Sequence, residues 1–357
     1  MKRIVLLLVC AAVLAACLSG CGGKETKTLN VYNWGEYISD GSEGTLDTID
    51  AFENWYEETY GVAVKVNYDT YASNEDMYNK ISSGAVSYDV IIPSDYMLSR
   101  LIEEDMLEKL NFDNIPNFSD VSDTFVDPPY DPTNEYSVPY MWGTVGIIYN
   151  TTMVQEDVTS WSILFDEDYA DQILMINNPR DAIGVALKYL GYSYNTTDKA
   201  QITEAVDLLV QQKPLVQTYV MDEIFDKLES GEAAIGVYYA GDYLTMLENN
   251  EDLAFCVPEE GSNYFVDAMC IPKGAANKEN AEKFINFMCS TEVGLANCDA
   301  IGYSTPLNSV LEALDAEVRE DPVAYPSDDV LSRCEQFLNL PQDILEFYDS
   351  EWLRLKV

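Results

Sequence analysis

The chain of 357 residues has no histidine and few basic residues, 20 Lys and Arg against 62 Asp and Glu. The absence of histidine excludes His-based catalytic triads, most zinc sites and the usual proton shuttle near neutral pH. The formal net charge of −42 disfavours nucleic acid and anionic lipid as partners and attracts cations. A cationic ligand is therefore compatible with the composition, although most of these carboxylates serve solubility.

Long apolar runs are confined to the N-terminus, and no later segment is apolar enough to cross a bilayer. Residues 4–16 follow a positively charged start and have the length of a signal-peptide core. The segment Leu18-Ser19-Gly20-Cys21 resembles a bacterial lipobox, in which the cysteine is lipidated and becomes the first mature residue. Cys17 is a rival cleavage point, and an ordinary signal peptide is the alternative to both. We expect a signal peptide at 1–20, a lipidated Cys21 with its tether at 21–28, and an exported domain held at the outer face of a bacterial membrane.

Cysteines are few and their spacing is uninformative, since no Cys-x-x-Cys pair suggests a metal or redox site. Five cysteines follow Cys21, an odd number that cannot all pair within the chain. We expect most of them to be small buried apolar residues, and one disulfide stays open. They are Cys256, Cys270, Cys289, Cys298 and Cys334.

The apolar pattern alternates between strand and helix periods, which predicts an α/β fold. Strands are expected at 29–34, 62–68, 88–92, 173–177, 234–239, 253–257 and 265–271. Helices are expected at 45–60, 75–83, 95–109, 182–190, 199–212 and 280–289. Two strand–helix–strand crossovers near the N-terminus predict a parallel sheet. The length after the leader, about 330 residues, suits two lobes rather than one core.

Three further stretches carry the connections of this fold. Residues 111–134 are rich in Asp, Asn and Pro and are expected to form a surface connection. Residues 136–150 form a long β-rich stretch interrupted by Pro139, which makes them a candidate crossing segment between lobes. The strand at 265–271 is the candidate for a second crossing.

Seven short segments, each weak alone, together resemble the substrate-binding proteins of polyamine ABC importers, the spermidine/putrescine-binding type. Their order and spacing carry the resemblance from about residue 29 to the C-terminus. The segments are VYNW at 31–34 with Tyr37, YASNE at 71–75, YDVIIPS at 88–94, SVPYMWGT at 137–144, ALKYLGY at 186–192, VDA at 266–268 and IGYSTP at 301–306.

The resemblance implies a type II periplasmic-binding-protein fold. Each of its two lobes is a mixed, mainly parallel sheet flanked by helices, and the ligand cleft lies between them. We expect lobe 1 to comprise 29–138 plus about 268–312, and lobe 2 to comprise 139–267 plus about 313–357. The implied function is capture of a polyamine and its delivery to ABC permease subunits. We expect a monomer with no cofactor, no metal and no catalytic role.

A diamine has two ammonium ends and an apolar middle, so its site needs carboxylates and aromatic walls. Ring faces attract ammonium groups by about 0.5–2 kcal/mol each. Charged hydrogen bonds add about 1.5–3 kcal/mol each. By resemblance, the site residues are Trp34, Tyr37, Asp95, Tyr96, Asn178, Asp181, Tyr239, Asp242, Phe265, Asp267 and Tyr303.

Some of these residues also have simpler interpretations. Asp267 is the strongest candidate, because a lone carboxylate in an apolar strand is costly unless it is paired. Trp34 could instead belong to the core, although it ends the first strand where α/β sheets place ligands. Asp95 is more readily interpreted as the N-cap of the helix that follows, and Asp242 has the same alternative.

The pattern predicts that putrescine is bound at least as tightly as spermidine. Residues 239–242, Tyr-Ala-Gly-Asp, resemble the Trp-Ala-Gly-Asp of putrescine-preferring members. Asn178 and Asp181 fall where spermidine-preferring members carry Asp and Glu, which weakens recognition of a third ammonium. Phe265 stands where the family usually has tryptophan. If spermidine were preferred, Glu36 and Glu335 would be the next carboxylates to consider.

Two alternatives from other classes stay open. Some relatives of this fold hold ferric iron with adjacent tyrosines, and Tyr238 and Tyr239 are such a pair. Strand alternation is expected to turn these two side chains to opposite faces, against that function. A carbohydrate hydrolase with paired carboxylates is the enzyme alternative, although 62 acidic residues make some proximity inevitable.

Overall fold

The computed structural model describes residues 26–357. The expected signal peptide, both candidate lipidation sites and most of the tether lie outside these residues. The described chain is a mixed α/β fold whose strands follow the order β2-β1-β3-β9-β4-β7-β5-β6, with β8 beside β4. The strands are β1 (Lys27–Trp34), β2 (Val64–Tyr71), β3 (Val90–Ile91), β4 (Ser137–Asn150), β5 (Ile173–Ile176), β6 (Val216–Val220), β7 (Ile235–Tyr239), β8 (Leu253–Cys256) and β9 (Tyr264–Cys270).

Parallel pairing dominates at the two outer parts of this sheet. On one side β1 pairs in parallel with both β2 and β3, as the two crossovers in the sequence predict. On the other side β5 pairs in parallel with both β6 and β7. The predicted α/β class with a mixed sheet is confirmed, although the sheet is not mainly parallel, since four strand pairs are parallel and four are antiparallel among the described residues.

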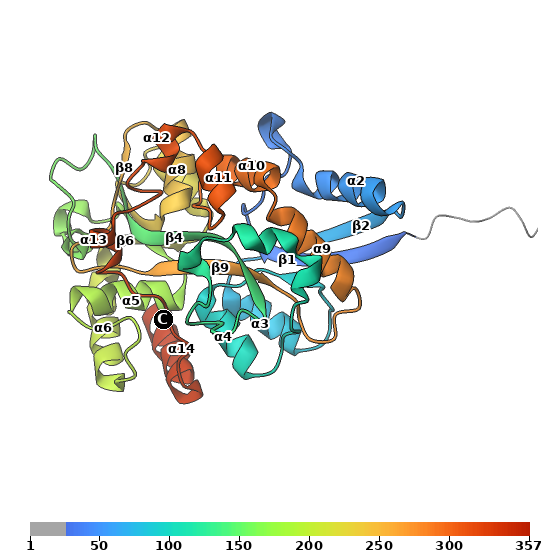
Figure 1. The fold of residues 1–357 in the computed structure, drawn as a ribbon. Coiled ribbons are helices and arrows are strands. Elements are labelled where there is room, and N and C mark those ends of the chain that lie inside the picture. The colour runs from blue at the N-terminus through green and yellow to red at the C-terminus, as the bar shows by residue number, and fades with distance from the viewer. Residues whose placement is uncertain (1–25) are drawn as a thin grey trace, which may run out of the picture.

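The long strand β4 crosses the middle of the molecule, antiparallel to β9 (Figure 1). Its first half, Ser137–Thr144, pairs with β9, and its second half, Val145–Asn150, pairs with β7 and β8. The pairing shifts between Pro139 and Met141, because proline cannot donate to the ladder. Both strands therefore run from one half of the sheet toward the other. We keep "lobe 1" and "lobe 2" for the ranges given above, a division that we propose from the sequence.

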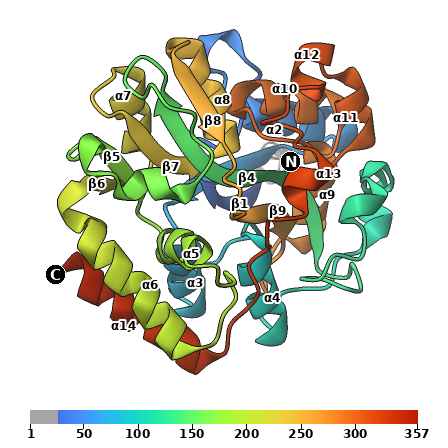
Figure 2. The same cartoon turned by 90° about the vertical axis from the view of Figure 1, so that its left-hand side faces the viewer.

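Helices lie on both faces of the sheet, and the last one packs beside α6 (Figure 2). The helices are α2 (Thr48–Tyr60), α3 (Asn74–Ser82), α4 (Asp95–Glu103), α5 (Pro179–Tyr189), α6 (Lys199–Gln212), α7 (Glu223–Glu229), α8 (Ala240–Asn249), α9 (Lys278–Met288), α10 (Thr291–Ile301), α11 (Asn308–Ala313), α12 (Ala316–Arg319), α13 (Asp328–Leu331) and α14 (Gln342–Lys356). Short 3-10 turns are η1 (Ser42–Gly44), η2 (Phe112–Asn114), η3 (Pro116–Asp120), η4 (Asp123–Phe125), η5 (Trp161–Phe165), η6 (Glu167–Tyr169) and η7 (Lys213–Leu215).

Local signals explain where α2 begins and ends. The Asp47 carboxylate accepts the Asp50 N–H at 2.9 Å, which caps the first turn. Gly61 takes a φ of 70°, the left-handed conformation that ends a helix most readily with glycine. The apolar stripe predicted from the sequence is buried at Phe52 and Tyr56.

The helix predicted at 95–109 is shorter than expected, because α4 ends at Glu103. Asp105 adopts a φ of 55°, which turns the chain, and Leu107 then forms an antiparallel bridge with Pro272. The apolar residues beyond Glu103 are thus buried by this bridge and not by a helix face.

All five described cysteines are free, with Cys270, Cys289 and Cys298 buried and Cys256 and Cys334 half-buried. Burial raises the pKa of the Cys289 and Cys298 thiols to about 12, so both behave as apolar groups. Within residues 26–357, no helix has both the length and the apolar character needed to cross a bilayer.

Candidate ligand-binding site

A cavity that is partly open to solvent lies where β1, β7 and β9 meet the first turns of several helices. Its empty space, including the open solvent at its mouth, is about 740 Å³. The cavity contains ten of the eleven residues predicted for the site, the exception being Asp95. The lining residues are Trp34, Gly35, Glu36, Tyr37, Tyr71, Ala72, Asn74, Ser94, Tyr96, Asn178, Asp181, Met221, Asp222, Phe225, Tyr238, Tyr239, Asp242, Asn263, Phe265, Asp267, Tyr303 and Phe337.

The lining combines many rings with charges of one sign. It includes ten aromatic side chains and five carboxylates, and none of these described lining residues is Lys or Arg. Like charges gathered in a cavity repel one another, so a cation that enters it relieves an existing cost. The five carboxylates are Glu36, Asp181, Asp222, Asp242 and Asp267.

Asp267 lies on β9 and is 4 % exposed. The Tyr37 hydroxyl donates to its Oδ2 at 2.7 Å, and its Oδ1 is buried without a hydrogen-bond partner. Burial raises the pKa of Asp267 to about 6, and hydrogen bonds from Ser94 and Tyr37 oppose the rise. The free oxygen of a buried carboxylate that lines the cavity is an acceptor for an incoming donor.

Asp242 lies in the first turn of α8, and the Tyr303 hydroxyl donates to its Oδ2 at 2.9 Å. Gly241 allows this arrangement, because a Cβ there would lie 2.1 Å from the Tyr303 ring. Burial raises the pKa of Asp242 to about 8, with Asp222 and Glu36 adding to the rise and Tyr303 opposing it. The N-cap of α8 is Tyr239, so the N-cap alternative for Asp242 is wrong.

Asn178 and Asp181 both lie at the start of α5. Asn178 is its N-cap, and the Asn178 Oδ1 accepts the Arg180 N–H at 3.0 Å. The Asp181 Oδ2 accepts the Tyr239 hydroxyl at 3.2 Å, while its Oδ1 is buried and unpartnered. Burial raises the pKa of Asp181 to about 7, which Tyr239 and the positive charge of Arg180 oppose.

The aromatic wall joins segments distant in sequence. Trp34 is half-buried at the end of β1, with its ring centroid 4.7 Å from that of Tyr71. Its position in the cavity lining argues against a purely core role. The ring centroid of Tyr303 lies 4.9 Å from that of Tyr37 and 6.1 Å from that of Phe265. The ring centroids of Phe265 and Tyr239 are 5.4 Å apart.

Tyr96 is anchored on the lobe 1 side of the cavity. Its hydroxyl donates to Glu75 Oε1 at 2.9 Å and accepts from Asn74 Nδ2 at 3.2 Å. The ring is thus held against the cavity by polar contacts at its far end.

Asp95 is placed differently from the prediction. It is 1 % exposed and does not line the cavity. As the first residue of α4, it folds back so that its carboxylate accepts the N–H of Tyr96 at 2.7 Å and of Val266 at 3.4 Å. The N-cap of α4 is Ser94, so the N-cap interpretation of Asp95 is wrong as well.

Tyr238 and Tyr239 also differ from expectation, because both line the cavity with ring centroids 4.9 Å apart. The prediction that they face opposite sides is wrong, because the two rings lie side by side where β7 ends at Tyr239, the N-cap of α8. Their hydroxyls donate to different carboxylates, Tyr238 to Asp222 at 3.1 Å and Tyr239 to Asp181 at 3.2 Å. Burial raises the pKa of both tyrosines, which opposes the tyrosinate form that iron requires.

Several lining residues carried no sequence signal. Asp222 and Phe225 come from the unpredicted β6–α7 region, and Phe337 comes from an irregular segment near the C-terminus. Glu36 adjoins the predicted wall and lines the cavity, with a φ of 44°. Within residues 26–357, no group of three or more His, Cys, Asp or Glu side chains is arranged to hold a metal ion.

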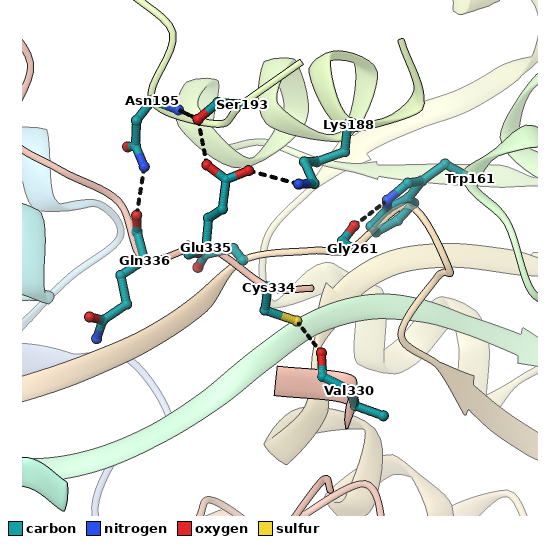
Figure 3. Close-up of polar contacts among 10 residues, drawn as sticks. Trp161, Lys188, Ser193, Asn195, Gly261, Val330, Cys334, Glu335 and Gln336 are labelled. Carbon is teal, nitrogen blue, oxygen red and sulfur yellow. Dashed lines mark hydrogen bonds and ion pairs between the residues drawn. The ribbon is translucent and has the colours of Figure 1, made fainter. Parts of the chain in front are cut away.

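We call residues 334–339 the strap. Glu335 does not line the cavity, because its carboxylate pairs with Lys188 Nζ at 2.7 Å and accepts from Ser193 (Figure 3). Asn195 donates to the Gln336 carbonyl at 2.8 Å and accepts the Leu338 N–H at 2.8 Å. These contacts hold the strap to α5 and to the turn that follows it, and they place Phe337 at the cavity wall.

Comparisons with known proteins agree with this geometry. The chain matches the family described as bacterial extracellular solute-binding protein over residues 47–325. It is 32% identical over 353 residues to the spermidine/putrescine-binding periplasmic protein of Salmonella typhimurium, covering 98% of this chain and 97% of that protein. It is 28% identical over 343 residues to the putrescine-binding periplasmic protein PotF of Escherichia coli, covering 90% of each.

Solved structures give the same result. A putative spermidine/putrescine ABC transporter from Listeria monocytogenes superimposes with a TM-score of 0.85 and 38% identity, covering 93% of this chain and 99% of that one. The spermidine/putrescine ABC transporter substrate-binding protein PotD from Streptococcus pneumoniae gives a TM-score of 0.76 and 36% identity, covering 92% and 98%. The fold, the cavity between its two halves and the near full-length similarity lead to one conclusion: the chain belongs to the bacterial extracellular solute-binding protein family.

Proposed function

We propose that this protein captures a polyamine outside the cytoplasm and delivers it to the permease of an ABC importer, binding putrescine at least as well as spermidine. The observation that carries the proposal is the cavity lining, with five carboxylates, ten aromatic rings and no described Lys or Arg. The relatives named for spermidine and putrescine binding support the same ligand class.

The chemistry of the lining suits a flexible dication. Asp267 and Asp242 each hold a tyrosine hydroxyl through one oxygen, which leaves Asp267 Oδ1 free for an ammonium. Ring faces of the wall residues Trp34, Tyr303 and Phe265 cover methylene groups and attract the ammonium ends. The ligand replaces its hydration with charged hydrogen bonds, which are strongest where water is excluded.

The cavity takes residues from both proposed lobes, so its ligand biases their relative position. Trp34 and Tyr37 belong to lobe 1, whereas Asp181 and Asp242 belong to lobe 2. A diamine that contacts both sets stabilises the closed arrangement, and the closed form docks on the permease. Binding then needs no catalytic group, no cofactor and no metal.

Membrane attachment is the second part of the proposal. We propose that a lipid on Cys21, with Cys17 as the alternative, anchors the mature monomer to a bacterial cell membrane. Cys21→Ser in the full chain is expected to abolish labelling by a palmitate analogue and to release the protein from the membrane fraction. Cys17→Ser is the matched control, and loss of labelling only in this variant would move the site to Cys17.

Ferric iron is the second candidate ligand, favoured by the adjacent rings of Tyr238 and Tyr239. Against it, each hydroxyl is committed to a different carboxylate. Addition of ferric citrate is expected to produce no tyrosinate-to-iron absorption, and a stable visible band would favour iron instead. The hydrolase alternative is tested by incubating the protein with glycosides. We expect no hydrolysis, and turnover of a glycoside would contradict a purely binding role.

Isothermal titration calorimetry with putrescine and with 1,4-butanediol tests the proposed function. The two compounds share a four-carbon chain but only putrescine carries charge. We expect one putrescine per protein to bind and no measurable heat from the diol. Equal binding of both, or of neither, would contradict the proposal.

A further inference from the structure

A buried cation lies directly behind the cavity wall. Arg180 is 3 % exposed, and its guanidinium carbon lies 4.5 Å from the ring centroid of Phe337 and 5.3 Å from that of Tyr96. Tyr348 completes this aromatic cage at 5.5 Å. Phe337 and Tyr96 line the cavity, so a single layer of rings separates the guanidinium from the ligand space.

Arg180 forms no ion pair within residues 26–357, unlike Arg100, Arg333 and Arg354. Its only hydrogen-bond acceptors are the Leu338 carbonyl and the Asn195 Oδ1, each at 3.4 Å, and its Nε is buried without a partner among the described residues. The charge is therefore not neutralised by a direct carboxylate contact and acts on its surroundings at longer range.

Two carboxylates with unused oxygens lie in that range. Asp181 Oδ1 and Glu75 Oε2 are both buried without hydrogen-bond partners. Burial raises the pKa of each, and the positive charge of Arg180 opposes both rises. Of the two, Asp181 lines the cavity. A third ammonium of a longer polyamine would seek its free oxygen and would meet the repulsion of the Arg180 charge.

The strap holds this cation in place. The Leu338 carbonyl accepts from Arg180, and the Leu338 N–H donates to Asn195. Glu335, in the same strap, is held by Lys188 and Ser193 (Figure 3). Asn339 adds a contact of 2.7 Å to Glu103 in lobe 1. The guanidinium is thus enclosed by three rings and by the strap, and it is almost fully buried.

We propose that Arg180 is a specificity-determining residue, whose fixed charge stands in for a third ligand ammonium beside Asp181 and so disfavours triamines relative to diamines. The inference rests on the proposed function, because it assigns charge discrimination to the same cavity. It is distinct from that function, since a polyamine-binding protein could reject triamines by length alone.

Two ligands of nearly equal length separate charge from length. Spermidine and N-propylputrescine have similar chains, but the second ends in a methyl group where the first has its third ammonium. Calorimetric titration of the full mature protein gives the affinity ratio of spermidine to N-propylputrescine. Arg180→Met is expected to raise this ratio at least about fivefold, which corresponds to a free-energy change of about 1 kcal/mol.

Two control variants bracket the result. Arg180→Lys keeps a charge in the cage and is expected to leave the ratio within about twofold of the wild type. Arg100→Met removes one positive charge from a surface pair with Glu104 and is expected to do the same. An unchanged ratio in Arg180→Met, or an equal rise in Arg100→Met, would overturn the proposal.

The wild-type protein supplies an independent test if Arg180→Met does not fold. N-propylputrescine is expected to bind the wild type at least as tightly as spermidine, although it carries one charge fewer. Spermidine binding more than about fivefold tighter would overturn the role of Arg180. If the wild type bound no diamine and no triamine, the proposed function itself would be contradicted. That result differs from failure of the Arg180 proposal, in which polyamines still bind.

Discussion

Two carboxylates that line the same cavity, Asp242 and Asp181, differ in what surrounds them. The Asp242 cluster, formed by Glu36, Asp222 and Asp242, contains only like charges, and they add to the raised pKa of Asp242, about 8. The Asp181 cluster, formed by Asn178, Arg180 and Asp181, has an amide and a buried cation beside its carboxylate. The pKa of Asp181 is about 7: burial and the like charges of Glu75 and Asp267 raise it, and the Tyr239 hydroxyl and Arg180 oppose the rise. The difference teaches that burial alone does not set the demand for a ligand cation. Where a positive charge of the protein lies near a buried carboxylate, a ligand ammonium is expected to gain less binding free energy there.

The largest expected effect concerns Asp267, which belongs to neither cluster and contacts Tyr37. Asp267→Asn should lower putrescine affinity at least tenfold, because truncating one partner of a desolvated charge pair costs about 2–5 kcal/mol. Asp95→Asn is the matched control, since Asp95 is as deeply buried yet does not line the cavity. Calorimetry on both folded variants checks the result, and equal losses would remove Asp267 from the site.

The comparison between clusters predicts unequal losses for two similar substitutions. Asp242→Asn should reduce putrescine affinity at least about tenfold, whereas Asp181→Asn should reduce it by less than about fivefold. The reason is that Arg180 already compensates Asp181, while nothing cationic among the described lining compensates Asp242. Equal losses of putrescine affinity in the two variants, measured by calorimetry, would contradict the distinction between the two clusters.

The raised pKa values predict that putrescine binding strengthens with pH. Asp267, Asp181 and Asp242 have pKa values of about 6, 7 and 8 in the free protein, so their protons must leave when a cation binds. Affinity should rise severalfold between pH 6 and pH 8, since the ammonium groups stay charged until about pH 10. Calorimetry in buffers of different ionisation enthalpy should detect proton release at pH 7, and proton uptake would contradict the account.

The same shifts predict an opposite trend for the free protein. Native carboxyls with pKa values of about 6 to 8 bind protons that the unfolded chain, with pKa values near 3.8, has lost. Their contribution to the free energy of unfolding is therefore present below about pH 4 and is lost as pH rises to about 8. Thermal unfolding of Asp242→Asn should show a flatter decline between pH 7 and pH 8 than the wild type, and an identical decline would contradict the raised pKa of Asp242.

The smallest expected effect is optical. Trp34 lines the cavity, so putrescine should change tryptophan emission in the wild type and much less in Trp34→Phe. Trp161 is fully buried and does not line the cavity, so its emission is not expected to respond to the ligand. If putrescine left the tryptophan emission unchanged although calorimetry showed binding, the ligand would lie away from Trp34.

The sequence predicts most of the scaffold because its long segments have clear periods. Helix α6 begins and ends where its apolar stripe does, and β1 pairs in parallel with its neighbours as the crossovers require. Trp34, which ends β1 at the cavity, could be named because α/β sheets place ligands there. Tyr239 was named from the resemblance of residues 239–242 to a family segment.

What the sequence could not predict depends on contacts between distant segments. Strand β6 is only half-buried and α7 has seven residues, so neither has a strong pattern, and Asp222 and Phe225 were missed with them. Phe337 lies in the strap, which has no regular structure of its own. No pattern of residues reveals that Arg180 is buried without an ion pair, because only the assembled cage shows it.

Titration of the wild-type protein with putrescine and spermidine at 0.15 M salt tests the central claim most directly. At that ionic strength the long-range pull of the acidic protein on the more charged amine is screened beyond about 8 Å, so contacts in the cavity decide. We predict that putrescine binds at least as tightly as spermidine. Spermidine binding more than about tenfold tighter, or about 1.4 kcal/mol, would contradict the account.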